Sequence, residues 1–135
     1  MNRLKAQETN LISFMIGDSR VSLLSEGQQN GKSNILIGAT PEILQKYTSD
    51  GSFPNATNAF LIKTPDDQII LIDAGYGRKL FDLLKELEVT PEQVNVVLIT
   101  HMHGDHIGGL LRDDKVAFPN ADFYLPQPEY DYWTT

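Results

Sequence analysis

The chain has 135 residues, of which 41% are hydrophobic and 21% are charged, as is typical of a soluble globular protein. Its 11 Lys and Arg residues against 18 Asp and Glu residues give a formal charge of −7, which disfavours binding to nucleic acid. The absence of cysteine excludes disulfides and thiolate metal sites, so imidazole and carboxylate groups would have to hold any metal. We expect a single domain over residues 1–135.

No stretch approaches the roughly 20 consecutive apolar residues that span a bilayer, so we expect no membrane association. Met1–Asn10 contains basic residues but no apolar run behind them, which is not the pattern of a secretory signal. We therefore expect a cytoplasmic protein.

Two strands joined by a tight turn are predicted first, at residues 10–16 and 21–24, with Gly17-Asp18-Ser19 between them. The polar segments Glu26–Ser33 and Ser49–Asn58 are rich in turn-forming residues, and we expect loops there.

A short helix between these loops is indicated by Thr40 as N-cap and Pro41 as first helical residue, and it should end near Tyr47. A second strand pair is predicted at residues 59–63 and 68–73.

The middle of the chain predicts a strand, a helix and a strand. Ile69–Ile72 is continuously apolar, which indicates a strand covered on both faces. Leucines at helical spacing predict an amphipathic helix over Arg78–Glu88. Thr90-Pro91-Glu92-Gln93 has the pattern of a capping box, and Val94–Thr100 reads as a second buried strand.

The last third predicts one or two helical turns over residues 105–111, a strand at 121–125 and a helix opening at 128–133. Strands alternating with helices in this order indicate an α/β (α+β) fold, with a mixed sheet and helices packed on at least one face.

The segment after the second buried strand gathers the residues that bind metals. His101 and His103 are two apart, so in extended backbone both imidazoles point the same way and can reach one ion. Gly104 lets the chain turn, and the position of Asp105 and His106 lets them serve a second ion.

Two ions roughly 3.5–4 Å apart can share a water and lower its pKa, and a neighbouring carboxylate can orient that water or carry its proton. We assign this catalytic role to Asp105. Gly108 and Gly109 would let backbone approach closely beneath the site.

The alternative explanation is an exposed polar loop with incidental histidines. It is disfavoured because the 3 histidines of the chain all lie in this one segment. Asp73, at the end of an earlier strand, is by itself better explained as a turn residue. Each of the aromatic residues Tyr47, Phe53, Tyr76 and Trp133 is better explained by packing than by a substrate pocket.

Residues 100–110, with the sequence THMHGDHIGGL, resemble the HxHxDH signature of the metallo-β-lactamase superfamily. Residues 58–62 and 70–75 resemble its opening strands and its Asp-containing first motif. The segment from Ile16 to Gly27 is similar to the start of its lactonase and methyl-parathion-hydrolase-like branches.

The resemblance implies the N-terminal half of an αββα sandwich. It also implies that His101 and His103 bind one metal, that Asp105 and His106 bind a second, and that Asp73 supports the loop from behind. The expected metal is Zn²⁺, two per complete site, with Fe or Mn as alternatives.

Members of this family also use a third histidine, a bridging aspartate and a final histidine, all from their second half. No histidine follows His106 here, so we expect an incomplete site and little activity from the 135-residue chain alone.

Three functions follow from these observations. The first is a metal-dependent hydrolase acting on a small-molecule lactone, ester, amide or phosphoester. The second is a non-catalytic split-gene product that forms a homodimer or associates with a missing C-terminal half. The third is a binding module that associates through an uncovered apolar sheet face.

Overall fold

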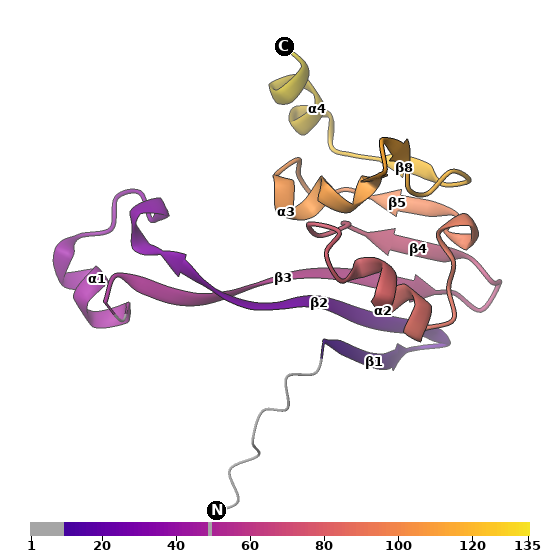
Figure 1. Ribbon diagram of the computed structural model, residues 1–135, viewed down its shortest axis with the longest axis horizontal. Helices are drawn as coiled ribbons and strands as arrows, with labels where there is room; N and C mark the ends of the chain where they lie inside the picture. Colours follow the sequence, from indigo (N-terminus) through magenta and orange to yellow (C-terminus); the bar gives the residue numbers. More distant parts are fainter. Residues whose placement is uncertain (1–9, 49) are drawn as a thin grey trace, which may run out of the picture.

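The computed structural model describes residues 10–48 and 50–135, and its main feature is a six-stranded mixed sheet with helices beside it (Figure 1). The strands, in their order across the sheet, are β1 (Leu11–Ile16), β2 (Ser19–Lys32), β3 (Ser52–Lys63), β4 (Ile69–Ile72), β5 (Val96–Leu98) and β8 (Asp122–Tyr124). Neighbours from β1 to β4 are antiparallel, whereas β4, β5 and β8 are parallel. The predicted mixed α/β sheet is confirmed.

The helices are α1 (Pro41–Tyr47), α2 (Leu80–Glu86), α3 (Gly104–Ile107) and α4 (Gln127–Thr134). Three 3₁₀ turns lie at Ser33–Ile35, Pro91–Gln93 and Gly108–Leu110, and a small hairpin pairs β6 (Leu111–Arg112) with β7 (Lys115–Val116). The predicted start of α1 is confirmed, since the Thr40 hydroxyl accepts a hydrogen bond from the Ile43 N–H at 3.4 Å. The Thr90 N–H donates to Gln93 Oε1 at 2.8 Å, as expected for a capping box, although only a 3₁₀ turn follows.

Two predicted loops are wrong. β2 continues into the first predicted loop and ends at Lys32. β3 begins at Ser52, inside the second predicted loop and before the predicted strand start at residue 59. These extensions pair from Gln28 with Ala56 to Lys32 with Ser52, and form an arm that reaches beyond the sheet and carries α1 at its end (Figure 1). The arm lacks apolar alternation because it buries little surface, while its backbone groups are still paired across the hairpin.

The hairpin of β6 and β7 was also not predicted. Its turn is made by Asp113 and Asp114, both at positive φ, a conformation that Asp tolerates better than most residues. The predictions made for Met1–Asn10 and for Ser49 concern residues that, apart from Asn10, lie outside the described part of the chain.

The core lies between α2 and one face of the sheet. Leu80 and Leu84 of α2 are at most 1% exposed, and Leu61, Leu71 and Val97, which are opposite one another in register on adjacent strands, are equally buried. The helical spacing of the leucines in α2 is thereby explained, because it directs them to one side of the helix.

The opposite face of the sheet is apolar but only partly covered. Ile70 and Ile72 point away from Leu71 and are partly exposed, so the prediction that β4 is covered on both faces is wrong for the described chain. Two cross-strand rows form this face: Phe14, Val21, Ile62, Ile70 and Val96 in one, and Ile12, Leu23, Phe60, Ile72, Leu98 and Tyr124 in the other. Phe14 and Ile12 remain 45% and 49% exposed.

None of the helices in residues 10–48 and 50–135 has the length and apolar character needed to cross a bilayer.

The packing predicts a sharp difference between two aliphatic truncations. Leu71→Ala should lower the free energy of unfolding by about 2–5 kcal/mol, because Leu71 is 0% exposed and a cavity would remain. Ile37→Ala should change it little, since Ile37 is 99% exposed. Chemical denaturation measures both, and equal effects of the two changes would contradict this account of the core.

Candidate functional site

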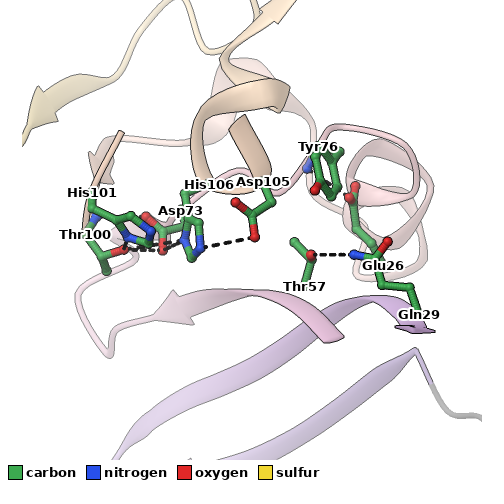
Figure 2. A network of polar contacts seen from close by, with 9 residues as sticks. All are labelled: Glu26, Gln29, Thr57, Asp73, Tyr76, Thr100, His101, Asp105 and His106. Atoms are coloured by element: carbon green, nitrogen blue, oxygen red, sulfur yellow. Dashed lines mark hydrogen bonds and ion pairs between the residues drawn. The ribbon is translucent and has the colours of Figure 1, made fainter. Parts of the chain in front are cut away.

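The candidate site lies where adjacent parallel strands end. Asp73 directly follows β4, and the histidine segment follows β5 after Ile99 and Thr100. Because parallel neighbours share an orientation, both segments leave the sheet at the same edge. The topology therefore brings Asp73 to the histidines, as Figure 2 shows.

Asp73 is a buried acceptor at the centre of a partly exposed hydrogen-bond network. Its side chain accepts from the Thr100 N–H at 2.8 Å, from the Thr100 hydroxyl at 2.7 Å and from His106 Nδ1 at 2.7 Å. Asp73 is 4% exposed and has a φ of +59°, a conformation that costs free energy for a residue with a Cβ. The network holds the residue there, so its role goes beyond the turn chemistry that its sequence alone favours.

The network assigns the tautomers of two histidines. A carboxylate only accepts, so His106 Nδ1 carries the proton that it donates to Asp73, and in the neutral ring Nε2 keeps its lone pair. The Thr100 hydroxyl gives its proton to Asp73 and accepts from His101 Nδ1 at 3.0 Å, which leaves Nε2 of His101 unprotonated as well. In their neutral forms both rings therefore have an unprotonated Nε2, the atom that would bind a metal if one is held here.

The side chains of Asp105 and His106 lie close to each other. Their Oδ2 and Nε2 atoms are 3.5 Å apart (Figure 2). Zinc bonds of about 2.0–2.2 Å at tetrahedral angles separate two ligand atoms by about 3.4 Å, so one ion fits between these two atoms. That Asp105 and His106 share an ion stays a prediction.

His101 and His103 lie in the same cluster. The ring centroid of His101 is 3.8 Å from that of His106 and 4.6 Å from that of His103. Among the described residues, however, no group of three or more His, Cys, Asp or Glu side chains is arranged to hold a metal ion. The predicted ligands are brought together, and their role as ligands stays a prediction.

Two glycines allow the backbone behind the loop to pack closely. A Cβ on Gly108 would lie 2.8 Å from the Cα of Tyr76, and one on Gly109 would overlap the carbonyl oxygen of Ala74. The Ala74 N–H donates to the His106 carbonyl at 2.7 Å across this contact. The expected close approach beneath the site is confirmed.

Sequence reasoning missed two carboxylates that hold this region together. Glu26, in the bulge of β2, accepts from the backbone N–H groups of Tyr76, Arg78 and Lys79 at 2.8, 2.7 and 3.1 Å. It thereby fixes the loop after Asp73 and the start of α2. No local signal identifies Glu26, because its partners lie 50 to 53 positions further along the chain.

Glu129 of α4 is the second of these carboxylates. It accepts from the Met102 N–H at 2.9 Å and from Trp133 Nε1 at 3.1 Å. The Met102 hydrogen bond is the main cause that holds the pKa of Glu129 below its usual value, and the Trp133 hydrogen bond lowers it further. Glu129 follows β8, which is parallel to β5 and ends beside it. A prediction of the strand order could therefore have placed Glu129 near the histidine segment.

The sequence and the fold are both similar to those of known proteins. A model of the metallo-beta-lactamase superfamily matches residues 53–112, which include Asp73 and the whole histidine segment. The solved structure of hydrolase AbOPH, described as a member of the beta lactamase superfamily, superposes with a TM-score of 0.81 at 29% identity. That match covers 96% of this chain and 48% of the other. The sequence over residues 53–112 and the fold of the chain are both similar to those of the metallo-beta-lactamase superfamily.

Other solved structures have a similar fold. A probable metal-dependent hydrolase from Staphylococcus aureus has a TM-score of 0.76 at 25% identity, over 90% of this chain and 51% of that one. The dizinc quorum-quenching lactonase AidC shares the fold, with a TM-score of 0.80 at 23% identity, over 93% and 48%. The chain thus spans about half the length of these proteins and corresponds to the N-terminal half of their fold.

Curated relatives match shorter parts. Exodeoxyribonuclease WalJ of Streptococcus pneumoniae is 43% identical over 54 residues, which are 39% of this chain and 20% of that protein. Hydroxyacylglutathione hydrolase 2 of Vibrio vulnificus is 33% identical over 75 residues, which are 56% of this chain and 28% of that protein.

The glycine contacts predict that a methyl group added at Gly109 disrupts the packing behind the site, whereas one added at Gly104 does not. Gly109→Ala should lower the free energy of unfolding by at least about 1–3 kcal/mol, because the clash is with backbone that cannot move aside. Gly104→Ala should be tolerated, since nothing lies within 4 Å of its Cβ position. Thermal unfolding compares the two, and a harmless Gly109→Ala would refute the packing argument.

Proposed function

We propose that this chain is the metal-binding part of a metal-dependent hydrolase, in which His101 and His103 bind one ion and Asp105 and His106 bind a second. The observation that carries this proposal is the chain of contacts from buried Asp73 through His106 to Asp105, at 2.7 and 3.5 Å. A turn residue needs no such contacts. A carboxylate behind a histidine is the usual way in which proteins orient a metal ligand.

The donor set fits Zn²⁺, because it consists of imidazole and carboxylate groups, and Fe and Mn are the alternatives. We propose two ions per complete site. Bound divalent ions lower the pKa of water to near neutrality and polarise the bond that is cleaved.

The residues of this chain have separate tasks in the proposed reaction. Asp73 and Thr100 hold the rings of His106 and His101 so that both Nε2 atoms face the site. The Asp105 side chain is 35% exposed, so water can reach its carboxylate, and we assign it the orientation of the attacking water and the transfer of its proton.

We propose a small-molecule substrate of the lactone, ester, amide or phosphoester class. The sequence similarity to a hydroxyacylglutathione hydrolase and the structural similarity to hydrolase AbOPH support hydrolysis. A nuclease is also among the relatives, but the charge of −7 on this chain favours a small molecule over a nucleic acid.

Metal binding tests the proposal. The 135-residue chain should bind Zn²⁺, and His106→Ala should weaken binding by at least about 10- to 100-fold because it removes a ligand. Glu86→Gln, on exposed α2 surface, is the matched control and should bind like the parent. Competition with a chromophoric chelator gives the affinities. The proposal would be contradicted if the parent chain held no zinc, iron or manganese above background. It would also be contradicted if His106→Ala left the affinity unchanged.

A second candidate role, favoured by the apolar sheet face opposite α2, is association with another sheet. The two rows that contain Phe14 and Leu98 form a continuous surface, and such surfaces mark interfaces. We propose that a C-terminal half of the same fold covers this face. On this proposal the chain alone has little hydrolase activity and associates with a second copy of itself.

Solution mass tests this role. The chain alone should form dimers or larger species, and Phe14→Lys should shift it toward monomer by placing a charge on the apolar face. Ile37→Lys replaces an even more exposed apolar residue outside that face and should leave the mass unchanged. Light scattering over a concentration series distinguishes them. A monomeric parent at every concentration would rule out self-association through this face.

A further inference from the structure

Glu129 is the one acidic side chain of α4 that bonds to the histidine segment in the described chain. Its carboxylate oxygen Oε2 accepts from the Met102 N–H at 2.9 Å and from Trp133 Nε1 at 3.1 Å. Asp131, on the same helix, is exposed and accepts instead from Gln127 at 2.6 Å. The contact of Glu129 with the site is therefore specific to its position in the helix.

The sheet explains why α4 reaches the site. β8 is parallel to β5, with Leu98 opposite Tyr124, and the Ile99 N–H donates to the Tyr124 carbonyl at 2.8 Å. The chain therefore leaves β8 beside the segment that leaves β5. α4 starts two residues after Leu125, at Gln127, so its first turn carries Glu129 to Met102.

The Met102 N–H belongs to the peptide unit that joins His101 to Met102. The orientation of this unit sets ψ of His101 and φ of Met102, two of the four backbone torsions between the Cα atoms of the two histidines. A carboxylate that holds the unit restricts the angle between the two side chains. Exposed backbone in a loop has no such restriction by itself.

The same carboxylate also restrains His103 from its other side. Trp133 donates its indole N–H to Glu129, and its ring meets the His103 ring edge to face, with centroids 6.2 Å apart and planes at 85°. One acceptor thus links the peptide that joins His101 to Met102 with the Trp133 ring that contacts His103.

We infer that Glu129 is a positioning residue, which holds His101 and His103 at the relative orientation needed to bind one metal ion. The inference rests on the proposed metal site and adds to it a residue from a separate element. In this inference Glu129 acts through the Met102 N–H and Trp133 and is not itself a ligand.

Two measurements on the full chain test this role. In the metal-free protein, Glu129→Ala should speed hydrogen exchange of the Met102 amide, because its acceptor is lost. In zinc titrations, Glu129→Ala should weaken binding by about tenfold or more, as removal of an orienting partner does at other sites. Glu129→Gln keeps an acceptor oxygen and should restore both values. Asp131→Ala is the control and should change neither.

The outcomes separate the two proposals. Unchanged Met102 exchange in Glu129→Ala, zinc affinity equal to that of Asp131→Ala, or no rescue by Glu129→Gln would each overturn the positioning role. A similar loss of thermal stability and affinity in Asp131→Ala would overturn it too, since the effect would then be general to α4. If even the parent binds no zinc, the proposed metal site fails, and the Met102 exchange rates still decide whether Glu129 holds the segment.

Discussion

The structure depends above all on the buried carboxylate of Asp73. It accepts three hydrogen bonds from Thr100 and His106, which lie 27 and 33 positions further along the chain. A buried carboxylate left without such partners costs about 1–3 kcal/mol or more, which is comparable to the cost of the positive φ of Asp73. These hydrogen bonds therefore connect the segments that follow β4 and β5 and help to position the histidine segment. They also place the Nδ1 proton of His106 toward Asp73.

The parallel arrangement of β4, β5 and β8 supplies the rest of the site. Three segments leave the sheet at one edge, and each contributes a different part: Asp73 as support, the histidines as proposed ligands and Glu129 as an acceptor for the Met102 N–H. Glycine contacts behind the loop and the Glu26 hydrogen bonds hold the neighbouring backbone close. Rigid support of this kind is what a metal site needs, because ligands must keep their geometry when no ion is bound.

The sheet is asymmetric, and the asymmetry bears on function. α2 covers one face and buries Leu61 and Leu71, while the opposite face keeps apolar residues such as Phe14 partly exposed. The chain aligns with about half of hydrolase AbOPH and half of the Staphylococcus aureus hydrolase, and our proposal places a second sheet on the surface that faces away from α2. On this hypothesis a second half of the fold would both cover the apolar face and supply the missing part of the proposed metal site.

The sequence by itself determined the features that depend on neighbouring residues. The spacing of His101, His103 and His106 predicts the chemistry of the loop, the Thr40 and Pro41 pair predicts the start of α1, and leucine periodicity predicts α2. Only the tertiary structure decided the β2–β3 arm, whose strands form without an apolar pattern, and the roles of Glu26 and Glu129. Their partners lie 27 to 53 positions away, so no local pattern encodes them, and only strand order and register bring them together.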